Sequence, residues 1–157
     1  MTARIATEWT SDVVLLDTDT MTILEREGPG AVRLRSRLAA VPLDDLATTV
    51  ISYEEQTRGW LAYMARLRTE SSRIQAYVFL KRHIEVYCRV AIIQYDARAA
   101  AEFERLKQAK IRIGTMDLKI AAITLSQRAI LVTRNRADFG RVPGLSVEDW
   151  TQESGSH

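Results

Sequence analysis

The chain has 157 residues, of which 46% are hydrophobic and 27% charged, proportions typical of one folded domain with a single core. The same composition excludes an intrinsically disordered or fibrous protein. The net charge of +2 and the isoelectric point of about 8.8 exclude binding of nucleic acid by overall charge, so any such contact needs local clusters of Lys and Arg.

The first twelve residues contain no apolar core of a signal peptide, and no later apolar run approaches the roughly 18 residues of a membrane helix. The single Cys88 forms no internal disulfide, and its neighbours indicate a mostly packed helix, so we interpret it as a core thiol. These observations predict a cytoplasmic protein with no membrane contact. We expect one domain over residues 1–150, followed by a loose polar tail over 151–157.

The first predicted element is a strand over residues 13–16, where four apolar residues run directly into Asp17. Such a run is typical of a strand buried on both faces, which would place Asp17 at its carboxyl end. Further strands are predicted at 46–51, 90–95, 129–133 and 145–147. Helices are predicted at 21–26, 31–40, 52–68, 71–89, 97–107, 115–127 and around 137–139. Their expected N-caps are Thr20, Ser52, Ser71 or Ser72, Asp96 and Thr115.

Alternation of strands and helices predicts an α/β fold with a mostly parallel sheet covered on both faces. The helices over 52–68 and 71–89 follow each other without an intervening strand, so we expect a long helical hairpin after the second strand. No internal repeat or linker interrupts the pattern.

Four acidic residues occupy related places in this outline, namely Asp17, Glu55, Asp117 and Asp138. Each lies at or just beyond the carboxyl end of a predicted strand or in the first turn of a neighbouring helix, where the ligand crevice of a parallel sheet lies. Carboxylates that converge are costly unless a cation lies between them, which indicates Mg²⁺ or Mn²⁺. With only two histidines in the chain, zinc is disfavoured.

Three of these acids also have ordinary structural interpretations. Ser52-x-x-Glu55 has the form of a capping box, Asp117 would place a negative charge at a helix N-terminus, and Asp138 has the context of a turn residue. Asp17 fits such an explanation least, because a carboxylate directly after four apolar residues needs a ligand or buried partners.

Five segments, in this order along the chain, resemble the PIN domain, and more narrowly the VapC-type toxins of bacterial toxin–antitoxin pairs. The resemblance spans residues 13–150. It is carried by Leu15–Thr20, Ile51–Gly59, Ile113–Ala122, Leu131–Phe139 and the terminal Pro143-Gly144-Leu145 with Glu148-Asp149-Trp150.

This resemblance implies a three-layer α/β/α fold and a metal-dependent endoribonuclease. The family's acidic quartet then corresponds to Asp17, Glu55, Asp117 and Asp138, with Glu55 preferred to Glu54 because the family glutamate stands four residues before a glycine, here Gly59. These acids would hold one or two Mg²⁺ or Mn²⁺ ions that activate water for hydrolysis of the phosphodiester, leaving a 5′ phosphate.

Further residues acquire roles from the same resemblance. Asn135 would support or replace Asp138, and the hydroxyl groups of Thr18, Thr20 and Thr133 would orient the carboxylates. Arginines and a lysine near the motifs are candidates for phosphate contacts. They are Arg58, Lys119, Arg134, Arg136 and Arg141.

The implied partners are the RNA substrate, a second copy of the chain in a homodimer, and a cognate antitoxin whose segment fills the groove. The hairpin over 52–89 is a plausible clamp for that antitoxin. We interpret its aromatic residues as core or interface rather than as platforms for stacked bases. They are Trp60, Tyr63, Tyr77, Phe79 and Tyr87.

Two other functions remain open at this point. Asp17-Thr18-Asp19 has the D-x-D form of haloacid-dehalogenase-like phosphatases, although Met21 and the absence of a late acidic pair depart from that family. A PIN fold that binds RNA or a protein without cutting is the second alternative, since fold does not fix function.

Overall fold

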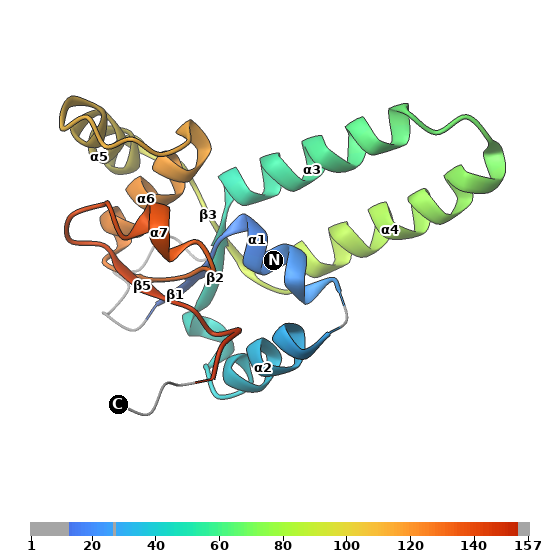
Figure 1. The fold of residues 1–157 in the computed structure, drawn as a ribbon, viewed down its shortest axis with the longest axis horizontal. Coiled ribbons are helices and arrows are strands. Elements are labelled where there is room, and N and C mark those ends of the chain that lie inside the picture. The colour runs from blue at the N-terminus through green and yellow to red at the C-terminus, as the bar shows by residue number, and fades with distance from the viewer. Residues whose placement is uncertain (1–12, 27, 154–157) are drawn as a thin grey trace, which may run out of the picture.

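The computed structural model describes residues 13–26 and 28–153 and contains a five-stranded, wholly parallel sheet (Figure 1). Its strands are β1 (Val14–Leu16), β2 (Leu46–Thr49), β3 (Ala91–Ile93), β4 (Ile130–Val132) and β5 (Ser146–Glu148). Their order across the sheet is β3-β2-β1-β4-β5, so β1 is central and pairs with β2 and β4. The predicted parallel sheet is confirmed.

Seven α-helices connect or follow these strands in the described residues. They are α1 (Thr18–Leu24), α2 (Pro29–Leu38), α3 (Val50–Ala65), α4 (Glu70–Cys88), α5 (Ala97–Gln108), α6 (Thr115–Gln127) and α7 (Arg136–Phe139), with a 3₁₀ turn, η1, at Leu43–Asp45. Every predicted helix is present, with boundaries that differ by a few residues.

The two faces of the sheet carry separate apolar clusters. Leu15 of β1 packs in the cluster that includes side chains of α5 and α6, whereas Val14 and Leu16 pack with Met21, Leu34 and other side chains of α1, α2 and the end of α4. Neighbouring residues of a strand point to opposite faces, so β1 must be apolar on both. The predicted three-layer α/β/α fold is confirmed.

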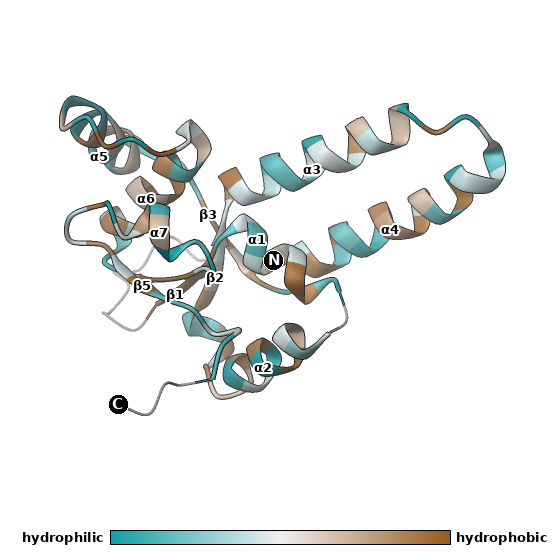
Figure 2. Cartoon of the chain, in the orientation of Figure 1, coloured by the Kyte–Doolittle hydropathy of each residue, from teal (hydrophilic) through white to brown (hydrophobic). Residues whose placement is uncertain are grey.

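Helices α3 and α4 form the predicted hairpin and extend together away from the sheet (Figure 1). Hydrophilic and hydrophobic residues alternate along both helices (Figure 2), and few of their side chains are buried. Large apolar side chains are exposed on the hairpin. They are Val50, Tyr53, Leu61, Tyr63, Ile74, Tyr77, Val78 and Ile84.

Three N-caps lie two or three residues before the predicted ones. Asp17 rather than Thr20 caps α1, Thr49 rather than Ser52 caps α3, and Thr69 rather than Ser71 or Ser72 caps α4. Each cap residue is extended, and its side-chain oxygen accepts a hydrogen bond from the backbone N–H three residues later. Consequently Ser52-x-x-Glu55 is not a capping box.

Of the other two predicted N-caps, one is wrong and one is confirmed. Helix α6 begins after Gly114 without a side-chain cap, so Thr115 is its first residue and not its N-cap. Asp96 caps α5 as predicted, and its carboxylate accepts from the N–H of Ala99 at 2.9 Å.

Two predictions of burial were wrong. Cys88 is exposed, because it lies on the outer side of the last turn of α4. Thr151, the first residue of the expected loose tail, is buried and hydrogen-bonded to Asp149, while 154–157 lie outside the described residues. The N-terminal segment examined for a signal peptide also lies outside them. No helix in the described part of the chain is long and apolar enough to cross a membrane.

Candidate acidic site at the carboxyl edge of the sheet

Asp17 follows β1 directly and is only 4% exposed. One of its carboxylate oxygens caps α1 by accepting from the Thr20 N–H at 2.8 Å. Burial raises the pKa of Asp17, and hydrogen bonds from Thr133 and Thr20 oppose that rise. The central strand therefore places a buried carboxylate at its carboxyl end, and hydrogen bonds from Thr20 and Thr133 hold it there. The sequence predicts this environment for a site residue.

Glu55 lies in the second turn of α3 and reaches back toward β1. Its Oε1 accepts a hydrogen bond from the Thr18 hydroxyl at 2.6 Å, which joins α3 to the start of α1. The neighbouring Glu54 instead pairs with Arg58, one turn later, at 2.5 Å on the exposed side of the helix. This geometry favours Glu55 over Glu54 as the acid that faces the edge of the sheet.

Asp117 lies in the first turn of α6. Its pKa is raised to about 6, first by partial burial and then by the negative charges of Glu55, Asp17 and Asp138. A carboxylate responds to another charge in this way only when the two are near each other. The four predicted acids are thus brought into one electrostatic neighbourhood from four separate segments.

Asp138 lies in α7, just beyond β4, and Asn135 is the N-cap of that helix. The Asn135 amide donates to Asp138 Oδ2 at 3.0 Å, and its carbonyl oxygen accepts from the Asp138 N–H at 3.3 Å. Arg141 approaches the same carboxylate at 3.7 Å. Asn135 is therefore hydrogen-bonded to Asp138 through both its amide nitrogen and its carbonyl oxygen.

The three predicted threonines contact the acids in different ways. Thr18 donates to Glu55, and the Thr133 side chain bonds Asp17 and also accepts from the Asn135 N–H at 2.9 Å. The Thr20 hydroxyl donates to the backbone oxygen of Val132 at 2.9 Å, so it ties α1 to β4.

Four of the five candidate phosphate ligands have partners among the described residues, namely Arg58, Lys119, Arg134 and Arg141. Both sides of the Arg134 guanidinium donate to Asp19, at 2.7 and 2.9 Å, and this pairing raises the pKa of Arg134 further. The Lys119 ammonium lies over the rings of Tyr95 and Phe103, 5.5 and 5.7 Å from their centroids. Arg134 is thus held at the edge of the sheet, whereas Lys119 packs against aromatic side chains of the α5 layer.

The donor chemistry of the site fits a hard divalent cation. Its donors are carboxylates, while His83 is occupied elsewhere, close to Thr57 and Glu25 at 2.9 and 3.4 Å. Within residues 13–26 and 28–153, no three acidic, histidine or cysteine side chains are grouped as a preformed metal cage. Mg²⁺ does not require such a cage, because it retains several waters and binds proteins through one or two carboxylates.

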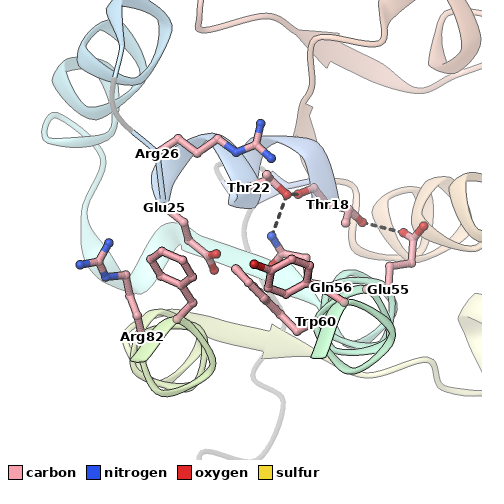
Figure 3. Close-up of a pocket in the computed structure, with 11 residues that line it drawn as sticks. Thr18, Thr22, Glu25, Arg26, Glu55, Gln56, Trp60 and Arg82 are labelled. Atoms are coloured by element: carbon pink, nitrogen blue, oxygen red, sulfur yellow. Dashed lines mark hydrogen bonds between the residues drawn. The ribbon is translucent and has the colours of Figure 1, made fainter. Parts of the chain in front are cut away.

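A cavity of about 600 Å³ adjoins the acids between α1, α3 and α4 (Figure 3). Thr18 and Glu55 line one end of it, and Trp60 lies in the middle. Sequence reasoning did not identify this cavity, because its walls come from three helices whose relative placement the residue pattern does not give. The remaining lining residues are Thr22, Glu25, Arg26, Gln56, Gly59, Tyr63, Phe79 and Arg82.

Gln56 is a further residue that the sequence pattern did not single out. Its amide donates to the Thr22 hydroxyl at 2.8 Å, and its carbonyl oxygen accepts from the buried Tyr87 hydroxyl. Burial raises the pKa of Tyr87, and the charges of Glu25, Glu55 and Asp17 add to that rise, so the hydroxyl keeps its proton. Gln56 thereby joins α3 to α1 and α4 immediately beside Glu55.

A family profile described as the PIN domain matches residues 14–145. The chain belongs to the PIN-domain family, in its VapC branch. Ribonuclease VapC1 of Haemophilus influenzae strain R2866 is 31% identical over 142 residues, which cover 89% of this chain and 99% of the relative. The structure of VapBC-1 from nontypeable Haemophilus influenzae aligns with a TM-score of 0.66 and 26% identity, over 89% of this chain and 99% of that one.

A second solved structure has the same fold as this VapC-type chain. It is VapBC-5 of Mycobacterium tuberculosis, described as a member of the VapBC family of toxin–antitoxin systems, with a TM-score of 0.55 and 24% identity. The alignment covers 88% of this chain and 97% of that one. Membership of the PIN family sets aside the haloacid-dehalogenase interpretation, and Asp19, the second acid of the D-x-D motif, is paired with Arg134.

Proposed function

We propose that this VapC-type protein is a Mg²⁺- or Mn²⁺-dependent endoribonuclease and the toxin of a toxin–antitoxin pair. The observation that carries the proposal is the convergence of Asp17, Glu55 and Asp138 on Asp117 from four separate segments. Burial, together with the charges of these three acids, raises the pKa of Asp117 to about 6. Mutual repulsion of this kind lowers the stability of the folded protein unless a bound cation neutralises it. The names of the relatives as ribonucleases support the reaction class.

In this proposal Asp17, Glu55, Asp117 and Asp138 hold the metal. The bound metal supplies positive charge that polarises the scissile phosphate and acidifies water. Thr18 orients Glu55, and Asn135 orients Asp138, through hydrogen bonds of 2.6 and 3.0 Å. Thr133 and the Thr20 N–H fix Asp17 at the end of β1. The Arg134–Asp19 pair keeps a guanidinium at the edge of the sheet, where an approaching phosphate meets it.

We further infer an antitoxin partner and a homodimer. Two observations support this part of the proposal: the VapBC family to which VapBC-5 belongs is described as one of toxin–antitoxin systems, and the α3–α4 hairpin exposes many large apolar side chains. Exposed apolar surface of this kind is typical of a site for protein association.

The test is incubation of purified, antitoxin-free protein with total cellular RNA and Mg²⁺ or Mn²⁺, followed by sequencing of new 5′ ends. The proposal expects discrete cuts that carry 5′ phosphates and disappear with EDTA or in Asp117→Asn. The matched control is Glu104→Gln, which neutralises an exposed acid of α5 that pairs with Lys107 and should leave cutting intact. Folded protein that cuts nothing with either metal would favour a PIN fold that binds without cutting.

A further inference from the structure

We propose that the cavity between α1, α3 and α4 is a subsite for one unpaired nucleobase of the RNA, stacked on Trp60. Arg26 and Arg82 then meet the phosphates on either side of that nucleotide. The inference rests on the proposed ribonuclease function and adds to it the region of the protein that selects single-stranded substrate.

The first step is continuity with the acidic site. Glu55 and Thr18, which form the hydrogen-bonded corner of that site, also line one end of the cavity, and Arg82 lies toward the other end (Figure 3). A strand whose phosphate lies at the carboxylates therefore has the cavity next along its path. At about 600 Å³ the cavity has the size of a small-molecule pocket and accommodates a nucleoside.

The second step is the aromatic wall. Trp60 and Phe79 come from opposite helices of the hairpin, with ring centroids 5.6 Å apart and planes tilted by 36°. Tyr63 meets Trp60 edge-on at 6.0 Å. The rings are not fully buried, and all three line the cavity. Aromatic side chains on which bases stack are a usual means by which proteins bind single-stranded RNA. This placement changes our interpretation of these residues as core or interface.

The third step is charge. Arg26 and Arg82 line the cavity and have no ion pair among the residues that the structure describes. Glu25 also lines it, but its carboxylate is close to His83, 3.4 Å from the ring nitrogen. Two guanidinium groups that flank an aromatic wall match a nucleotide, which combines a flat base with negative phosphates. Bases in an A-form helix are stacked and inaccessible, so the base must be unpaired.

The experiment measures binding, in EDTA and again in Ca²⁺, of fluorescein-labelled octauridylate, octaadenylate and an eight-unit abasic ribose-phosphate backbone. Trp60→Ala should weaken binding of the base-bearing octamers by about 5- to 150-fold, the range expected for loss of one stacked base. It should leave binding of the abasic backbone unchanged. Trp60→Phe should retain most of the affinity, and Arg82→Gln should weaken all three probes.

The matched control is Tyr77→Ala, because Tyr77 is an aromatic residue of the same hairpin that is 59% exposed and does not line the cavity. A second measurement needs no variant: an octamer containing 5-iodouridine, irradiated with the unaltered protein, should cross-link to the α3 peptide that carries Trp60. Cross-links confined to other peptides would overturn the subsite.

Equal binding of base-bearing and abasic probes would also overturn it, as would unchanged octamer binding by folded Trp60→Ala. If that variant loses affinity only for the antitoxin, the cavity belongs to the protein partner. Failure of the proposed nuclease gives a different result from failure of the subsite. If the protein binds bases through Trp60 but cuts no RNA, the subsite stands and the nuclease proposal fails. If Trp60→Ala cuts RNA with an unchanged KM, the nuclease stands and the subsite fails.

Discussion

The Asp117 carboxyl is half-buried in the first turn of α6, and the charges of Glu55, Asp17 and Asp138 act on it. Its pKa is about 6 in the folded protein, against about 3.9 in an unfolded chain. Between these values the folded protein holds the proton more tightly. Asp117 therefore lowers the stability of the metal-free protein as the pH rises from about 4 through 6, with the full cost present above that range.

Asp117→Asn should accordingly raise the Tm of the metal-free protein at pH 8, by a few degrees for a chain of this size. The gain should shrink as the pH falls through 6 and vanish near pH 4, where the native carboxyl is also neutral. Thermal unfolding in EDTA across this pH range measures it.

Asp19→Asn is the matched control for that experiment. Asp19 pairs with Arg134, and its charge has only a minor effect on Asp17, so its neutralisation mainly removes an attraction and should lower the Tm slightly or leave it unchanged. A destabilised Asp117→Asn at pH 8 would show that the acids do not repel one another there.

In the proposed metal site, Thr18 acts on metal binding through Glu55. Thr18→Val removes the 2.6 Å hydrogen bond to that carboxylate, and we expect Mn²⁺ affinity to fall by about 10- to 100-fold, as for other residues that orient metal ligands. Isothermal titration calorimetry measures the change. Thr48→Val provides the comparison, because the Thr48 hydroxyl donates to Leu16 O within the sheet. Equal Mn²⁺ affinities in the two variants would show that Thr18 has no part in metal binding.

At the scale of elements, the hairpin is fixed to the domain at its base. Tyr87 of α4 is 3% exposed and donates to Gln56 of α3, which in turn donates to Thr22 of α1. This relay and the Thr18–Glu55 hydrogen bond together hold α3, and with it Glu55, against α1. Farther out, α3 and α4 bury few side chains.

Tyr87→Phe should lower the free energy of unfolding by about 1 to 3 kcal/mol, because it leaves the Gln56 carbonyl oxygen buried without a donor. Denaturation by urea measures the change. Tyr77→Phe removes the same hydroxyl from an exposed tyrosine of the same helix and should change the stability little. Similar values for the two variants would contradict the role of the relay.

For the whole molecule, the sequence pattern predicted the sheet and the acidic quartet because both depend on local signals. The apolar run before Asp17 is typical of a strand buried on both faces, and Asp96 stands alone before an alanine-rich helix. The predicted N-caps of α3 and α4 were wrong because two hydroxyl residues three positions apart, such as Thr49 and Ser52, are both suitable N-caps. The Arg134–Asp19 pair and the walls of the cavity join segments distant in sequence, and no local pattern reports such contacts.

Burial also differs greatly between the parts of the molecule, which predicts their dynamics. Seven residues of α6 are buried against three of the longer α4, so hydrogen exchange should be slowest in α6 and fastest near the turn between α3 and α4. Mass spectrometry of exchanging amides measures this order, and the antitoxin should slow exchange along the hairpin. Uniform protection of both hairpin helices in the isolated chain would contradict it.

Asp17 is at once the N-cap of α1 and a proposed metal ligand, whereas Asp117 caps nothing and is repelled by its neighbours. A cell that carries an active toxin benefits from mutations that inactivate it. Substitutions at the two positions differ in their effect on the stability of the protein. Under the proposed function, loss of Asp17 removes the activity together with a helix cap. Loss of Asp117 would remove the activity but would also remove the repulsion, so it stabilises the metal-free fold. Under selection for an inactive protein that still folds and binds its antitoxin, we expect substitutions to accumulate at Asp117 before they do at Asp17.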